Sequence, residues 1–315
     1  MNNFKLFIIL AFITLFSCTK DKQIYKRSTE NKRKEEIRQL NTSDSLATDL
    51  LKIIDESGVD ECYPFFVEKS NTIYFQRKLR DGFWTIAKKK LDKDTVIVQI
   101  YDDNSNCTNP VVDNDGRYIA YLSDRYGITD KDGFKYRDVI LYDSDLKISK
   151  VLSDRISDNY SVKINGAKIY FISNTKDKLK LAYDKNEKLT LFCYNLETKS
   201  LEEIVLNYSF FDYYPSGNFV CFIDNEFKLK YGTVDDIKTF DIDGYCGDPI
   251  VSGDKIFISH RNENIMDFYY LDINTGTKTK MEYFGGFGGY FPVKDRLFFH
   301  KKSGNDFGIY SNLIK

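Results

Sequence analysis

The chain has 315 residues, which is long enough for one large domain or two of ordinary size. Its formal net charge of −1 argues against a nucleic-acid-binding protein and against a surface that binds anionic membranes. Aromatic residues make up 16% of the chain, and nearly all are Tyr or Phe. This composition favours strands, because aromatic side chains fit a pleated, half-buried surface.

The N-terminus has the pattern of an export signal. Lys5 is followed by twelve apolar or small residues at 6–17, too few for a bilayer span of about 20 residues and typical of a signal-peptide core. The segment ends in LFSC at 15–18, which resembles a bacterial lipobox in which Cys18 is lipidated. The alternative is a plain secretory signal followed by an incidental cysteine.

These features predict a bacterial cell-envelope lipoprotein. We expect a signal peptide at 1–17 and then a lipidated Cys18 with a polar tether over 18–46. Two or more acyl chains would anchor the protein stably in a membrane. The outer membrane is favoured, because residues 19–22 contain no clear inner-membrane retention signal.

A repeat marked by the five prolines of the chain follows the tether. After each proline come a few residues, a polar turn and an apolar triplet. The triplets begin at Ile73, Ile119, Val220, Ile256 and Leu297. A sixth copy has Ser161 in place of proline and Ile169 at the start of its triplet, so successive triplets lie 46, 50, 51, 36 and 41 residues apart. Periods of about 40–50 residues with strand-like content are typical of propeller blades.

Each repeat predicts four strands, lettered A to D from the proline. Proline is tolerated at the first residue of a strand, so we expect it to open strand A. The sixth repeat stops after strand C, whereas residues 49–54 read as a strand D without a blade of their own. In blade six that strand would close the ring and remove an exposed edge. The sequence therefore predicts an all-β fold over about 47–315, a six-bladed propeller of four-stranded antiparallel blades.

One repeat carries a recognisable motif. Within residues 109–124, Pro110 is followed by DG at 115–116 and by IAYLS at 119–123, an arrangement that resembles the PD40, or TolB-like, relatives of the WD40 repeat. The resemblance covers most of the mature chain at the level of the repeat. It implies an extracytoplasmic binding scaffold, although a fold alone does not give a function.

Acidic turns and histidines are the candidates for a metal site. The sequence DNDG at 113–116 offers oxygen donors, but the ligand positions that an EF-hand loop requires hold Val111 and Leu122. Asp, Asn and Gly are also what a tight turn needs, so we predict the A–B turn of blade two. We interpret His260 and His300, at the ends of strand B in adjacent blades, as surface or rim residues. The sequence thus indicates no metal and no cofactor.

Five cysteines follow Cys18, an odd number that cannot all pair internally. Cys62, Cys107 and Cys246 lie two or three residues before a proline, in what we predict to be the same D–A loop of three repeats. Cys62 and Cys107 belong to adjacent blades, and a disulfide between them requires Cα atoms within about 7 Å. The alternatives are small buried packing residues and a thiolate metal or redox site.

Long loops distinguish one face of the predicted ring. Strand direction alternates within a blade, so D–A and B–C loops share a face, with long B–C loops at 124–137 and 174–188. The Gly-rich segment 284–292 enters blade six there, as a binding loop or as a loop packed over the ring. Long loops on a rigid scaffold are where binding usually occurs. The expected ligand-binding residues are Tyr63, Arg125, Tyr126, Tyr160, Phe287 and Tyr290.

The predicted function is non-catalytic binding of an envelope protein, a peptide or a glycan. No Ser-His-Asp order, P-loop or HExxH motif is present, so we assign no catalytic residue. The alternative is a polysaccharide-active lyase or hydrolase at the channel mouth. Two or more carboxylates with a His or Arg in that mouth would favour the enzyme, whereas an aromatic or hydrophobic rim would favour the scaffold.

Overall fold

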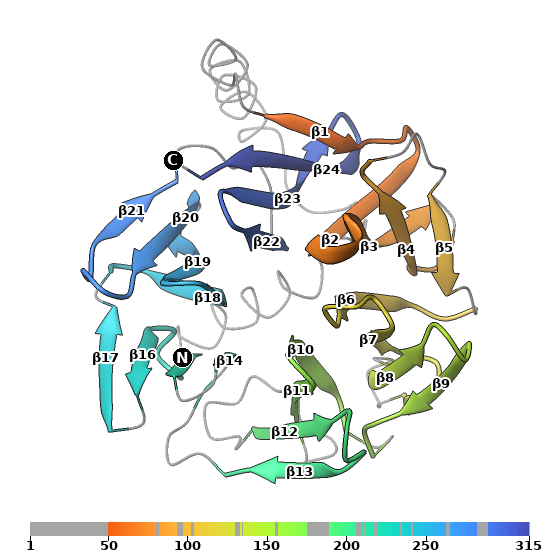
Figure 1. Cartoon of the computed structure of the whole chain (residues 1–315), viewed down its shortest axis with the longest axis horizontal. Coiled ribbons are helices and arrows are strands. Elements are labelled where there is room, and N and C mark those ends of the chain that lie inside the picture. The colour runs from red at the N-terminus through yellow and green to blue at the C-terminus, as the bar shows by residue number, and fades with distance from the viewer. Residues whose placement is uncertain are drawn as a thin grey trace.

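In the computed structural model, six four-stranded antiparallel sheets form a ring (Figure 1). The structure describes residues 50–79, 82–92, 97–101, 104–129, 133, 135–154, 157–174, 189–205, 210, 212–216, 219–233, 235–240, 242–262, 265–281 and 289–314. Within these residues, the one helical element is the 3-10 turn η2 (Glu68–Ser70), and no helix has the length and apolarity to cross a membrane. The predicted six-bladed propeller is confirmed.

The inner two strands of each blade are A and B. Strand A is innermost, and its members are β2 (Val59–Val67), β6 (Cys107–Val112), β10 (Asn159–Asn165), β14 (Asp212–Ser216), β18 (Tyr245–Ser252) and β22 (Tyr290–Val293). Strand B is represented by β3 (Thr72–Leu79), β7 (Tyr118–Ser123), β11 (Lys168–Ser173), β15 (Phe219–Ile223), β19 (Lys255–Asn262) and β23 (Arg296–Ser303). All six apolar triplets lie on strand B, as predicted.

The outer two strands of each blade are C and D. Strand C is represented by β4 (Thr85–Lys90), β8 (Asp138–Asp143), β12 (Thr190–Asn195), β16 (Leu229–Thr233), β20 (Ile265–Asp272) and β24 (Asp306–Leu313). Strand D is represented by β5 (Val98–Tyr101), β9 (Ile148–Val151), β13 (Leu201–Ile204), β17 (Asp236–Phe240), β21 (Lys278–Lys280) and, in blade six, β1 (Leu51–Ile54).

The N-terminal strand closes the ring, as the sequence predicts. β1 pairs antiparallel with β24, with Lys52 opposite Tyr310, and the strand order of blade six is β1-β24-β23-β22. Ile54 is buried in a cluster with Phe298 of blade six and Phe75 of blade one. Gly58 N–H also donates to a carboxylate oxygen of Asp306 at 2.8 Å. Both backbone pairing and packing therefore hold the two ends of the propeller together.

The hydrophobic core lies between neighbouring blades. In one cluster, Ala120 and Val139 of blade two pack with Ile169 and Phe171 of blade three, and all four are at most 1% exposed. Burying a side chain of the size of Ile or Phe contributes about 1.5–3 kcal/mol. The apolar triplets are thus the residues that join each blade to the next.

Proline lies inside strand A and not at its first residue. Pro64 is the sixth residue of β2, and Pro110 is the fourth residue of β6. Strand A pairs only with strand B, so its inner edge requires no ladder hydrogen bond from the proline nitrogen. The expectation that proline opens strand A is therefore wrong, and the edge position of the strand is the reason proline is tolerated.

Strand A also carries a β-bulge in four of the six blades, where its pairing with strand B shifts register. Each bulge contains one non-glycine residue with positive φ. These residues are Tyr63 (52°), Asn109 (54°), Ser161 (54°) and Asp248 (49°). In blade three, Val162 therefore occupies the position of the proline, and Ser161 precedes it.

The bulges redefine which residues correspond between blades. One equivalent position lies three residues before the proline, or before Val162 in blade three. It is occupied by Glu61, Cys107, Asn159 and Cys246, and each of these residues is at most 3% exposed. At three of these positions the backbone N–H donates to the preceding blade, with Trp84 O accepting from Cys107 at 2.7 Å. The predicted D–A loop placement of Cys62, Cys107 and Cys246 is wrong, since all three lie in strand A.

Candidate functional site

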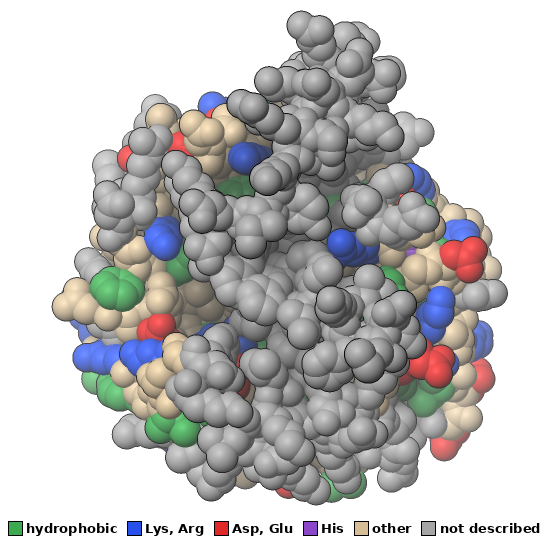
Figure 2. Space-filling view, turned by 180° about the vertical axis from the view of Figure 1, so that it is seen from behind, with side chains coloured by type: hydrophobic (Ala, Val, Ile, Leu, Met, Phe, Trp, Pro, Cys, Tyr) green, Lys and Arg blue, Asp and Glu red, His purple; other side chains and the backbone are tan. Residues whose placement is uncertain are grey.

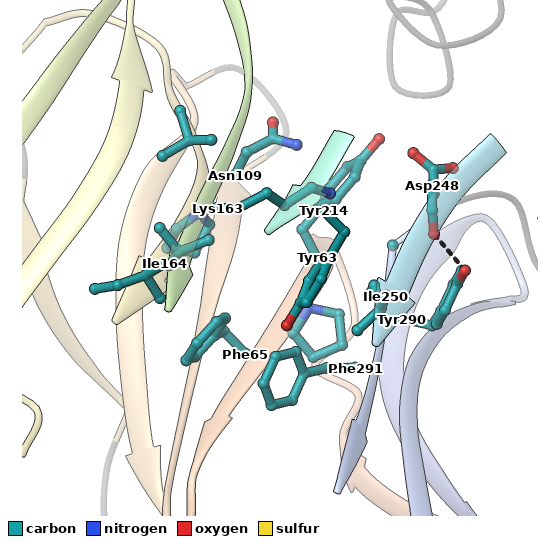
Figure 3. A pocket seen from close by; sticks show the side chains of 15 residues that line it. Tyr63, Phe65, Asn109, Lys163, Ile164, Tyr214, Asp248, Ile250, Tyr290 and Phe291 are labelled. Atoms are coloured by element: carbon teal, nitrogen blue, oxygen red, sulfur yellow. Dashed lines mark hydrogen bonds between the residues drawn. The ribbon is translucent and has the colours of Figure 1, made fainter. Parts of the chain in front are cut away.

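A cavity of about 100 Å³ lies at the centre of the ring, between the innermost strands of all six blades (Figure 3). We call it the channel cavity. A space of this size admits a single residue-sized group and not the folded surface of a partner. Its lining comes from two sets of equivalent strand A positions, one mainly apolar and one mainly polar.

The first set is opposite the second residue of each strand B triplet, and we call it the apolar ring. Its members are Phe65, Val111, Lys163, Tyr214, Ile250 and Phe291. Phe65 and Phe291, from adjacent blades, have ring centroids 4.2 Å apart. Lys163 is the exception, because a cation occupies a position that is apolar or aromatic in every other blade.

The second set consists of bulge residues, and we call it the polar ring. Its members in the cavity lining are Tyr63, Asn109 and Asp248, with Gly289 at the entry to strand A of blade six. A Cβ atom on Gly289 would lie 2.8 Å from both His300 Nδ1 and Tyr63 Cδ1, and its φ is 53°, so glycine is required there. Because strand A runs away from the D–A loops, the polar ring lies nearer the D–A/B–C face.

Opposite charges face the channel cavity from different blades. Lys163 extends from β10 into the cavity, and Asp248 lies on β18 on the other side of Tyr214 (Figure 3). No described residue forms an ion pair or hydrogen bond with the Lys163 ammonium. Burial and then the charge of Asp212 raise the pKa of the Asp248 carboxyl, whereas Lys163 lowers it. The two charges therefore influence each other without pairing.

Hydrogen bonds fix the wall around Asp248. The Tyr290 hydroxyl donates to the Asp248 backbone carbonyl, and the Ser259 hydroxyl donates to an Asp248 carboxylate oxygen at 3.3 Å. The Tyr290 ring packs edge-on against Phe268 at 5.3 Å, and its phenol is buried. Burial also raises the pKa of Tyr214 to about 12, so this phenol stays a neutral donor at physiological pH. This part of the lining is preorganised.

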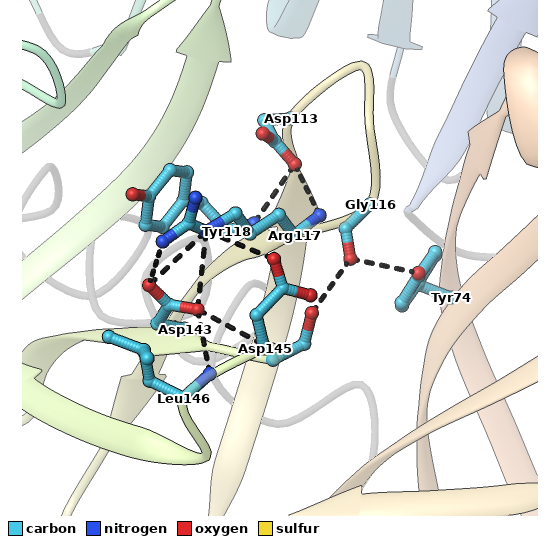
Figure 4. Close-up of polar contacts among 9 residues, drawn as sticks. Tyr74, Asp113, Gly116, Arg117, Tyr118, Asp143, Asp145 and Leu146 are labelled. Atoms are coloured by element: carbon cyan, nitrogen blue, oxygen red, sulfur yellow. Dashed lines mark hydrogen bonds and ion pairs between the residues drawn. The ribbon is translucent and has the colours of Figure 1, made fainter.

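The acidic turn at 113–116 is structural. An Asp113 carboxylate oxygen accepts from the backbone N–H groups of Arg117 at 2.8 Å and Tyr118 at 2.9 Å (Figure 4). The Arg117 guanidinium then pairs at 2.8 Å with Asp143, the last residue of β8. Asp113 therefore stabilises the A–B turn of blade two, as predicted from its Asp, Asn and Gly content.

The structure places two of the predicted ligand-binding residues at the channel cavity, namely Tyr63 and Tyr290. The Tyr160 ring instead packs on the core between blades three and four. Arg125 stacks over the ring of Tyr126 at 5.2 Å in the B–C loop of blade two, outside the cavity lining. Tyr126 is 44% exposed there. Phe287 and Cys18 lie outside the described residues.

The five cysteines and two histidines that the structure describes are all buried. Cys62 and Cys107 are thiols with 0% exposure, and Cys107 Sγ lies 3.8 Å from the Ser123 hydroxyl. Their burial agrees with the alternative that they are small packing residues, and no disulfide joins them in this structure. His260 and His300 are 3% and 2% exposed, so their interpretation as surface or rim residues is wrong.

Each histidine has a structural role. The Tyr63 N–H donates to His300 Nδ1 at 3.3 Å, and His260 Nε2 hydrogen bonds the Asp243 carbonyl. Among the described residues there is no cluster of three or more His, Cys, Asp or Glu side chains that suits a metal ion.

Charges on the outer surface are intermixed. Figure 2 shows described Lys and Arg side chains interspersed with Asp and Glu around the rim of one face. This distribution agrees with the net charge of −1 and offers no single-signed area on the described part of that face. The charges inside the channel cavity are therefore the more specific feature.

Several lining residues were missed from the sequence. The residue before each of the five prolines lines the cavity, and of these only Tyr63 was predicted. The other four are Asn109, Tyr214, Asp248 and Phe291. Proximity to proline was thus an available signal. Lys163 was hidden because the repeat was aligned with Ser161, and not Val162, at the proline position.

No protein-family model and no curated protein matches the sequence. Solved structures resemble the fold. TolB from Acinetobacter baumannii matches with a TM-score of 0.54 and 14% identity over 92% of this chain and 71% of its own. A putative TolB from Agrobacterium tumefaciens matches with a TM-score of 0.56 and 12% identity over 85% of this chain and 97% of its own.

The fold is that of a TolB-like six-bladed propeller. An oligogalacturonate lyase from Vibrio parahaemolyticus is also similar, with a TM-score of 0.57 and 12% identity over 84% of this chain and 93% of its own. At such identities the TolB-like likeness establishes architecture alone, because one propeller fold serves binding proteins and enzymes.

Proposed function

We propose that this chain is a cell-envelope lipoprotein whose propeller binds a protein, a peptide or a glycan without catalysis. The observation that carries the proposal is the channel cavity, in which every blade contributes one residue of the apolar ring. A cavity with apolar walls and a few oriented polar groups is the usual form of a binding site. The ligand is expected to approach from the D–A/B–C face, nearer the polar ring.

The lyase or hydrolase alternative has less support. It requires two or more carboxylates with a His or Arg in the channel mouth. Among the described lining residues there is one carboxylate, Asp248, accompanied by Lys163 and several aromatic rings. The aromatic and apolar lining favours the scaffold.

The export and lipidation part of the proposal rests on the LFSC sequence at 15–18. Labelling of cells with a lipid precursor is expected to label the wild-type protein, and the Cys18→Ala variant should lose the label. Retention of label in that variant would contradict lipidation at Cys18.

The binding face is tested with a photo-crosslinking amino acid at two positions of blade two. Tyr126 is exposed on the B–C loop, whereas Asn114 is exposed on the A–B turn of the opposite face. In living cells, position 126 is expected to yield a reproducible adduct and position 114 is not. Equal adducts from both positions, or none from position 126, would reject this binding face.

A further inference from the structure

The polar and charged groups of the channel cavity narrow the class of ligand. Lys163 is the cation within the apolar ring. Long charged side chains normally keep their head groups in water or pair them. Lys163 directs its ammonium into the channel cavity, where no described residue pairs with it. An anionic group of a ligand would supply the missing partner.

The opposite wall of the cavity carries a carboxylate, Asp248, that lacks a cationic partner among the described residues. Asp248 receives a hydrogen bond from Ser259 at 3.3 Å, and no described cation pairs with its carboxylate. Asp212, close enough to influence Asp248 electrostatically, adds a second negative charge on the neighbouring blade. A cationic group of a ligand would neutralise this side.

The apolar ring supplies the third element. Phe65 and Phe291 lie side by side below the charged groups, with Ile164 and Ile250 on either side (Figure 3). These side chains offer an apolar surface to a ligand whose charges are held above it. The volume of about 100 Å³ limits this part of the ligand to one small side chain.

We propose that the channel cavity binds a zwitterionic ligand of amino-acid or dipeptide size with an apolar side chain. Its carboxylate pairs with Lys163, its ammonium pairs with Asp248, and its side chain lies on Phe65 and Phe291. The proposal rests on the proposed function, since it names the chemistry of a ligand for the same cavity.

The test uses the full chain purified in detergent and calorimetric titration with L-leucine. N-acetyl-L-leucine keeps the carboxylate but lacks the ammonium, and L-leucinamide keeps the ammonium but lacks the carboxylate. Each removes one ion pair, so each is expected to bind at least about tenfold more weakly than L-leucine. Equal affinity of either analogue, or no saturable binding of L-leucine up to about 10 mM, would overturn the proposal.

Two variants test which group of the ligand each charged side chain pairs with. In Lys163→Met, L-leucine should bind no better than L-leucinamide, and in Asp248→Asn it should bind no better than N-acetyl-L-leucine. Lys168→Met, at an exposed position of the same blade, is the matched control and should bind as the wild type does. If a variant fails to fold, the analogue series on the wild-type protein decides alone.

The outcome separates this inference from the proposed function. An adduct at position 126 without leucine binding would reject the zwitterionic ligand and retain the binding scaffold. Loss of both the face-specific adduct and leucine binding would reject both. Leucine binding that persists unchanged in Lys163→Met and Asp248→Asn would place the amino acid elsewhere and also reject the inference.

Discussion

Strands A and B of the same blades differ in how regular their sequences and their strand pairing are. Strand B repeats itself, and its triplet residues such as Ile73, Ile169 and Ile256 are fully buried in unbroken ladders. Strand A bulges in four of the six blades, carries positive φ angles and varies in residue type at equivalent positions, as Phe65, Lys163 and Tyr214 show. The regular strand B therefore builds the ring, whereas the irregular strand A provides the residues available for binding.

The largest effect is expected from truncating a strand B residue. Phe75→Ala should reduce the free energy of unfolding by about 3–5 kcal/mol, because its fully buried ring leaves a cavity between blades. Phe65→Ala is the matched strand A variant, and its half-buried ring in the channel cavity should cost less. Chemical denaturation measures both. Equal losses would break the comparison between the two strands.

A second effect concerns Glu61, the carboxyl at the buried interblade position of strand A. Neither of its oxygens has a hydrogen bond of ordinary geometry among the described residues, although the Glu56 backbone lies near enough to lower its pKa, and Arg77 Nε lies 3.6 Å away. Burial raises the pKa of Glu61 to about 7, against a partial lowering by Arg77. A raised folded-state pKa means that folding favours the protonated form, so the contribution of Glu61 to stability is lost as pH rises from about 4.5 to 7.

Glu61→Gln should therefore increase the free energy of unfolding at pH 8 by on the order of 2–3 kcal/mol and have little effect at pH 4. Denaturation across this pH range measures the difference. Glu226→Gln, at an exposed turn, is the control and should leave the pH profile unchanged. A wild-type profile that Glu61→Gln does not alter would contradict the assignment.

A third, smaller effect tests the polar ring. The pKa of Asp248 is raised by burial and by Asp212, so the carboxyl becomes neutral at a higher pH than an ordinary Asp. Affinity for L-leucine should fall as pH decreases through that pKa, by up to about tenfold, because a neutral carboxyl no longer pairs with the ammonium. Titration at several pH values should show this trend in the wild type and a flat profile in Asp248→Asn.

The smallest effect concerns the bulge conformation. Asn109 has a φ of 54°, which glycine adopts without a steric penalty. Asn109→Gly should change the free energy of unfolding by less than about 1 kcal/mol in the stabilising direction, since Asn already tolerates this region. Thr108→Gly, at the adjacent residue without positive φ, should destabilise instead. If both variants destabilise equally, the bulge does not constrain Asn109.

The sequence predicted the regular part of this protein well. Prolines and apolar triplets were enough to count the blades and to place strand B, because burial imposes a repeated pattern there. The missing strand D of the sixth repeat assigned residues 49–54 to blade six, where the structure has β1 at Leu51–Ile54. The bulges were not predictable, since one inserted residue in strand A leaves the apolar pattern of strand B intact. Cys62 and Cys107 were treated as equivalent although they lie two and three residues before their prolines, and Ser161 was aligned with the prolines in place of Val162, which concealed Lys163.

The pairing of β1 with β24 has a consequence for how the chain folds. The contact between Gly58 and Asp306 spans 248 positions of sequence. Closing a flexible loop of that length costs about 5 kcal/mol of chain entropy, so isolated pairing of these ends is unfavourable. Five blades must first bring the ends together, which makes closure a late event and gives the propeller a slow, topology-limited route to its native state.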